Sequence, residues 1–244
     1  MYLNLLKKSF QINSSYRRFN SISVSGYLIN RLANFFIPIF LILKVKPNTI
    51  TVINFFIGCF CIIFLFIFDS VFFSYSILLY ILNKILDHCD GGLARFYKKK
   101  TFFGKLIDSI SDALFLSFFN LSLAVFFYLK TNNFYLIIFG SVSSIFICFD
   151  IFILDKFSSL VRWCNQENKN KFPAYIRKSN YPRLFYSFED LIFLGVIILY
   201  FFKNNLDLSQ KILFAIFFVH CISFFLNIFK HILLGYKFLN YNKR

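Results

Sequence analysis

Six long apolar segments are the feature that most restricts how this chain of 244 residues can fold. A helix needs about 20 predominantly apolar residues to cross the hydrocarbon core of a bilayer, and the segments are of about that length. We therefore predict an all-α membrane protein whose six transmembrane helices surround a polar cavity open to the cytoplasm. The predicted helices are Asn48–Phe68, Val71–Leu86, Leu106–Leu129, Phe134–Leu154, Leu184–Phe202 and Ile212–Leu234.

The composition excludes disorder and an ordinary water-soluble fold. Hydrophobic residues make up 58% of the chain and charged residues 16%, whereas soluble domains average about 45–50% and about 25%. The net charge of +16 is expected of a protein whose basic residues flank its spans, so we expect no nucleic-acid partner. The six cysteines lie mostly in apolar stretches without metal-ligand spacing, which is typical of reduced core residues.

The distribution of lysine and arginine predicts the orientation in the membrane. The arm through Lys46 carries seven of these residues, Gly91–Lys105 five, Asp155–Phe185 seven and the tail from Lys230 four. The intervening turns hold only Lys130, Lys203 and Lys211. Because basic residues are retained on the cytoplasmic side, we expect both termini in the cytoplasm. A bacterial inner membrane is the predicted location, with an organelle membrane as the alternative.

The N-terminal arm contains one further amphipathic segment. Apolar residues recur at helical spacing from Leu28 to Leu43, and Pro38 is expected to bend a helix there. We interpret this segment as a helix that lies in the membrane interface. The predicted organisation is a cytoplasmic arm with the interfacial helix (1–46), a six-helix catalytic domain (47–235) and a basic cytoplasmic tail (236–244).

Four carboxylates stand where apolar helices begin or end. Asp87 and Asp90 are spaced i, i+3 at the end of the second predicted span, and Asp108 and Asp112 are spaced i, i+4 at the start of the third. Each pair projects from one face of its helix. Antiparallel neighbouring helices would bring all four together, and hard divalent cations are the natural remedy for the resulting repulsion. The pattern therefore predicts metal-assisted phosphoryl transfer at the cytoplasmic interface.

The same residues form a longer signature. The segment Asp87–Asp112 matches the pattern D-x2-D-G-x2-A-R-x8-G-x3-D-x3-D, and it resembles the hallmark of the CDP-alcohol phosphatidyltransferases. Pro47–Thr51 also resembles the segment that opens the first span in that family. The likeness is strongest from about Arg31 to Asp112, and beyond Asp155 it is one of topology alone.

The resemblance implies transfer of a phosphate-linked alcohol, often phosphatidyl from CDP-diacylglycerol, to the hydroxyl of a second alcohol with release of CMP. It implies a homodimer in the membrane, with membrane lipids around it. It assigns Asp112 as the catalytic base and Mg²⁺ or Mn²⁺ as the cofactor. The implied metal ligands are Asp87, Asp90, Asp108 and Asp112, and the implied CDP-binding residues are Asp87, Asp90, Gly91, Ala94, Arg95, Gly104 and Asp108.

The acceptor alcohol stays open at this point. We name Lys105 and Arg162 as candidate acceptor-binding residues. Arg162 belongs to a long basic loop that suits a phosphorylated acceptor, such as glycerol 3-phosphate or an inositol phosphate, and equally suits anionic lipid headgroups.

Three alternative functions are retained. The donor can be a soluble CDP-polyol with a lipid or a polyol phosphate as the acceptor. Intramembrane acids also mark cation pathways, so a cation-coupled transporter is the alternative from a different class. A pathway should place polar residues at mid-membrane, whereas these acids gather at one interface. A catalytically silent lipid-binding relative is the third reading, and the intact signature disfavours it.

Overall fold

The computed structural model describes the backbone of residues 2–16, 24–97, 102–167 and 182–241, and side chains within 2–11, 25–97, 104, 106–153 and 191–233. These parts of the chain are helical and include no strand, which confirms the all-α prediction. The helices are α1 (Tyr2–Tyr16), α2 (Val24–Ile42), α3 (Pro47–Leu65), α4 (Ser70–Phe96), α5 (Phe102–Thr131), α6 (Tyr135–Glu167), α8 (Pro182–Phe202) and α9 (Leu206–Tyr241).

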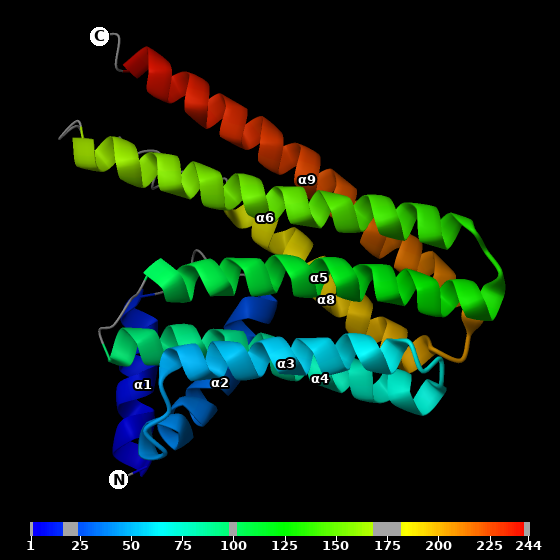
Figure 1. Ribbon diagram of the computed structural model, residues 1–244, viewed down its shortest axis with the longest axis horizontal. Coiled ribbons are helices and arrows are strands. Elements are labelled where there is room, and N and C mark those ends of the chain that lie inside the picture. The colour runs from blue at the N-terminus through cyan, green and yellow to red at the C-terminus, as the bar shows by residue number, and fades with distance from the viewer. Residues whose placement is uncertain (1, 17–23, 98–101, 168–181, 242–244) are drawn as a thin grey trace.

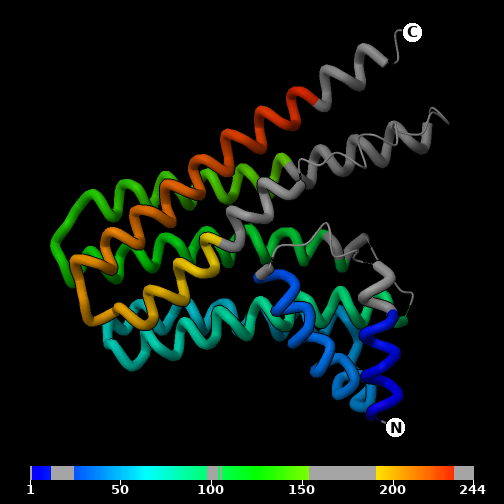
Figure 2. Tube along the Cα trace, turned by 180° about the vertical axis from the view of Figure 1, so that it is seen from behind, coloured from blue at the N-terminus to red at the C-terminus, as the bar shows by residue number. Residues whose placement is uncertain are grey.

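The long helices lie side by side and alternate in direction. Figure 1 shows α3 and α4 on one side, α5 next to them, and α6 and α9 on the other side, while α1 and α2 run across one end. Figure 2 shows α8 on the rear face, where it contacts α4 and α9. Both chain ends lie at the end of the bundle that α1 and α2 cross (Figure 1). The signature residues are at this same end, because α4 finishes there and α5 starts there.

Six described segments are long and apolar enough to cross a membrane, and the chain is an integral membrane protein. This set differs from the predicted spans in two places. It includes Ser25–Ile42 of α2, which the sequence assigned to the membrane interface. For the predicted span Leu184–Phe202, the described residues contain a shorter apolar stretch, Leu191–Phe202 of α8. By length and composition α2 resembles a span, although it runs across the bundle in Figure 1. Its placement in the interface stays a prediction.

Helix α2 is apolar on two faces. Ile29, Ala33 and Ile37 are buried against α4, whereas Leu28 and Leu32 on the opposite side are exposed. The helix continues through Pro38. The exposed apolar face has to contact lipid, because an apolar surface this long is unfavourable in water.

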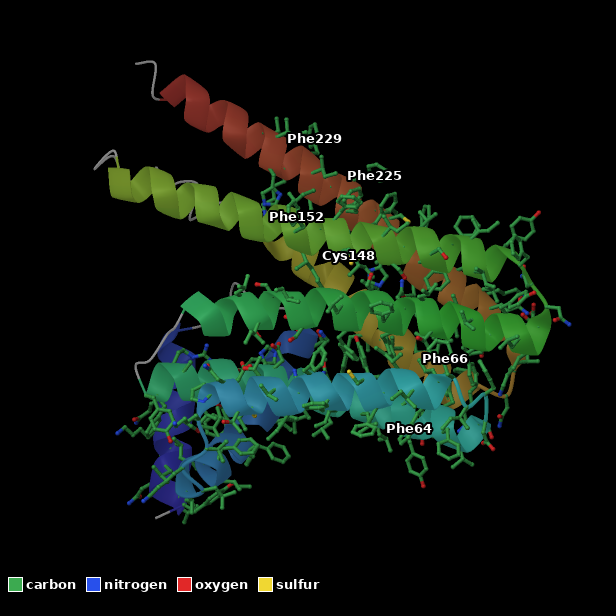
Figure 3. All side chains as sticks on the ribbon, in the orientation of Figure 1. Phe64, Phe66, Cys148, Phe152, Phe225 and Phe229 are labelled. Atoms are coloured by element: carbon green, nitrogen blue, oxygen red, sulfur yellow. The ribbon has the colours of Figure 1, made fainter. Side chains whose placement is uncertain are left out.

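Phenylalanine has two roles in the bundle. Inside it, the rings of Phe73 and Phe126 stack with their centroids 4.8 Å apart, and those of Tyr80 and Phe119 stack at 4.6 Å. On the outside, Figure 3 shows Phe229 projecting from α9, and this side chain is 61% exposed. Phe225 is 60% exposed, and its ring borders Phe146 of α6 with the centroids 5.5 Å apart. The outer rings face the lipid, so abundant phenylalanine does not by itself indicate a large core.

Helices α5 and α6 are joined by small residues and by polar side chains. The Nδ2 of Asn120 donates a hydrogen bond to Ser143 Oγ at 2.6 Å, and the Ser117 hydroxyl donates to the carbonyl oxygen of Ser144 at 2.5 Å. At Gly140, an added Cβ would lie 2.3 Å from the Cβ of Ala124. Small residues are typical of tight membrane helix contacts because they let two backbones approach closely.

We expect Gly140→Ala to destabilise the protein, because the new methyl group would overlap the fixed Cβ of Ala124 and push α6 from α5. Overpacking of this kind costs about 1–3 kcal/mol, which a lower melting temperature in detergent would reveal. Val142→Ile is the matched control, since it adds one carbon to the exposed face of the same helix. Equal melting temperatures for the two variants would contradict the close α5–α6 contact.

Candidate metal and phosphoryl-transfer site

The signature lies on two uninterrupted helices. The predicted second span ends at Leu86, but α4 continues to Phe96 and carries Asp87, Asp90 and Arg95 within regular helix. Likewise α5 begins at Phe102, before Asp108. The carboxylates are therefore held by rigid helical backbone on both sides, which fixes their separation more tightly than a loop would.

Three carboxylates converge between the two helices. Asp87 and Asp90 of α4 and Asp108 of α5 each offer an oxygen atom, and these atoms lie within 4.8 Å of one another. Asp90 is buried, whereas Asp87 and Asp108 are half-buried. The sequence prediction that antiparallel helices bring these acids together is therefore correct for these three residues.

Asp112 lies one turn further along α5 and is half-buried. Its carboxylate is close enough to interact electrostatically with Asp87, Asp108 and Lys84. Lys84 is on α4, one turn before Asp87, so it supplies a positive charge beside an otherwise acidic group. Asp112 is thus next to the cluster and one turn deeper in the membrane than Asp108.

Thr51, to which the sequence pattern assigns no role, completes the site from a third helix. The Thr51 hydroxyl lies 2.7 Å from Asp90 Oδ2, to which it donates a hydrogen bond, and 3.3 Å from the carbonyl oxygen of Pro47. Helix α3 begins at Pro47, so Thr51 is in its second turn. The only sequence signal was its place in the Pro47–Thr51 segment; that this residue contacts Asp90 depends on the packing of α3 against α4.

The remaining CDP-binding candidates are on the same two helices. An added Cβ at Gly91 would lie 3.4 Å from Arg95 Nη1, so the guanidinium of Arg95 covers Gly91 one turn away. Ala94 on α4 and Gly104 on α5 are half-buried. The backbones of Lys105 and Arg162 belong to α5 and α6, but their side chains lie outside the described residues.

The donor set fits a hard divalent cation. Three carboxylates within 4.8 Å repel one another strongly at low dielectric, and a cation bound by oxygen ligands removes that repulsion. No nitrogen or sulfur ligand is in the described cluster, and an all-oxygen set suits magnesium or manganese rather than zinc. Asp87, Asp90 and Asp108 would hold the ion, and Thr51 would orient Asp90.

Comparison with known proteins agrees with this site. The family model for CDP-alcohol phosphatidyltransferase matches residues 44–226, a range that contains the whole signature together with α3 and most of α9. The chain therefore belongs to the CDP-alcohol phosphatidyltransferase family.

One curated relative is similar over a shorter range. A protein of Archaeoglobus fulgidus named bifunctional IPC transferase and DIPP synthase is 38% identical over 117 residues. The match covers 47% of this chain and 22% of the relative. The chain thus spans only about a fifth of that relative's length.

We expect Thr51→Val to weaken metal binding, because Asp90 loses the hydrogen bond that orients it while the side chain keeps its size. Loss of such a supporting contact typically costs about 10–100-fold in metal affinity. Titration of the purified protein with Mn²⁺, followed by electron paramagnetic resonance, measures this directly. Thr51→Ser retains the hydroxyl and should bind Mn²⁺ as the wild type does; equal affinity in all three proteins would exclude the role of Thr51.

Proposed function

We propose that this protein is a metal-dependent transferase that moves a phosphate-linked alcohol, phosphatidyl from CDP-diacylglycerol, to the hydroxyl of a second alcohol and releases CMP in phospholipid synthesis. The observation that carries the proposal is the convergence of Asp87, Asp90 and Asp108 within the complete family signature. Family membership supports the donor class, and the apolar exterior supports a lipid donor. A soluble CDP-polyol is the alternative donor.

Each residue of the site has a place in the reaction. A Mg²⁺ or Mn²⁺ ion bound by Asp87, Asp90 and Asp108 would neutralise the diphosphate and make CMP a better leaving group. Asp112 accepts the proton of the acceptor hydroxyl. The oxygen of that hydroxyl then forms a bond to the phosphorus that carries the donor's alcohol. The bond from that phosphorus to the bridging oxygen breaks, and CMP takes the electron pair. Arg95 offers a planar fork of donors to the phosphates.

Two basic residues are proposed to bind the acceptor. Lys105 and Arg162 are basic and belong to helices that start or finish at the end of the bundle where the signature lies (Figure 1). A phosphorylated acceptor would complement their charge. The homodimer, which the family resemblance implies, stays a prediction.

The bundle end that carries the signature is proposed to face the cytoplasm of a bacterial cell. The parts of the described chain at this end are the start of α1, the ends of α4, α6 and α9 and the start of α5 (Figure 1). The segments that contain or adjoin these helix ends in the sequence carry 23 of the 27 lysine and arginine residues in the counts given above. The opposite end has three short turns, near Phe68, Asn132 and Asn204, and the orientation rule for basic residues supports placing it outside.

This orientation predicts where a tag at the C-terminus can be reached. A C-terminal epitope tag should be removed by added protease in inverted inner-membrane vesicles and protected in intact spheroplasts. A tag inserted after Asn204, in an outer turn, is the matched control and should behave in the opposite way. Cleavage of the C-terminal tag in spheroplasts would reverse the orientation.

The central test is CMP release by the purified protein given CDP-diacylglycerol, with and without Mg²⁺ or Mn²⁺, and with glycerol 3-phosphate, inositol, inositol phosphate or serine as the acceptor. We expect metal-dependent release with one acceptor. Asp112→Asn should lower turnover about 10²–10⁴-fold, the usual contribution of a general base, while CDP binding persists.

Asp207→Asn is the matched control, because Asp207 is an exposed acid that pairs with Lys211 at 2.7 Å at the other end of the bundle. It should leave turnover unchanged. Full activity of Asp112→Asn would exclude it as the base. Absence of CMP release with every acceptor would move the donor to another CDP-alcohol. Absence of metal-dependent CDP binding as well would favour the transporter.

A further inference from the structure

Helix α3 carries a buried amide oxygen for which the described residues supply no hydrogen-bond partner. Asn54 on α3 is only 6% exposed, and its Oδ1 has no donor among the described residues. Buried side-chain oxygens are bonded in the large majority of cases, so an exception calls for an explanation, such as a group that the protein itself does not contain.

The register of α3 against α5 locates this oxygen. The two helices run in the same direction (Figure 1), and an added Cβ at Gly58 would lie 2.9 Å from Phe115 Cδ2. Thr51 precedes Gly58 by the same seven residues by which Asp108 precedes Phe115. Asn54 precedes Gly58 by four residues and Asp112 precedes Phe115 by three. Thr51 is therefore level with the metal-binding carboxylates, and Asn54 is level with Asp112.

The contact between α3 and α4 leaves the side-chain oxygen of Asn54 without a hydrogen bond. Asn83, one turn before Asp87, donates from Nδ2 to the main-chain oxygen of Asn54 at 3.1 Å. This bond joins α3 to α4 through the backbone of Asn54. The Oδ1 atom is left as an acceptor, and the donor that it lacks has to be an O–H or N–H group.

We propose that Asn54 Oδ1 accepts a hydrogen bond from a hydroxyl group held next to Asp112. This inference rests on the proposed function and deepens it. The hydroxyl comes either from the acceptor alcohol, which has to lie within hydrogen-bond reach of the base, or from an ordered water molecule that positions the acceptor. In the first case Asn54 binds acceptors with more than one hydroxyl group, because the hydrogen of the attacking hydroxyl is taken by Asp112 and a second hydroxyl donates to Asn54. In the second case Asn54 is a positioning residue.

The test compares Asn54→Val with Asn54→Thr in the CMP-release assay. The two side chains have nearly the same shape, but only threonine keeps an oxygen acceptor. For Asn54→Val we expect about a tenfold loss, the value of one hydrogen bond, with unchanged KM for CDP-diacylglycerol and unchanged melting temperature. Asn54→Thr should recover part of this loss.

The kinetic parameters distinguish the two sources of the hydroxyl. A raised KM for the acceptor identifies the acceptor alcohol, whereas a lowered kcat at unchanged KM identifies the water. Asn120→Leu removes another buried amide, one that is bonded to Ser143, and should lower the melting temperature without changing either parameter. Wild-type kinetics in both Asn54 variants would overturn the inference.

An inactive wild-type protein would count against the proposed function, and an experimental structure in a lipid nanodisc would then decide the inference separately. Water or a ligand hydroxyl within hydrogen-bond distance of Asn54 Oδ1 would support it. A protein donor at that position would overturn it.

Discussion

The mutual repulsion of three carboxylates within 4.8 Å is the constraint on which the rest of the site depends. Repulsion of this kind is severe where apolar helices lower the dielectric constant, and it would drive α4 and α5 apart unless the charge were neutralised. Three features of the chain oppose this repulsion. The helices form a rigid framework, Thr51 donates a hydrogen bond to Asp90, and the carboxylate oxygen atoms can bind a cation. We therefore expect the stability of the α4–α5 contact to depend on a bound divalent cation.

The neighbouring helices supply what the signature lacks. Helix α3 provides Thr51 and Asn54 on one face, and Gly58 on that same face lets α3 approach Phe115 of α5. The site is consequently a three-helix structure in which α4 and α5 carry charge and α3 carries neutral oxygen atoms. The hydrogen bonds between α5 and α6 lie deeper in the bundle and join polar side chains to one another or to backbone oxygen atoms. They hold the two helices together.

Much of the fold could be predicted from the sequence, because a bilayer imposes a length and a polarity that apolar segments record directly. The segment of α2 is the exception. Helix α2 is apolar on two faces, one buried against α4 and one exposed, so its composition suits both a span and an interfacial helix. Helical spacing alone does not separate these cases, because the same pattern serves contact with lipid and contact with protein.

The sequence by itself determined the class of chemistry, since Asp87, Asp90, Asp108 and Asp112 are close in the chain and their spacing fixes the helix faces from which they project. Only the tertiary structure decided which other residues join them. Thr51 and Asn54 are more than thirty residues away from Asp87, and nothing local in an apolar span marks a threonine or an asparagine as facing an acid. That assignment depends on helix register, which is set by side-chain packing between segments distant in the sequence.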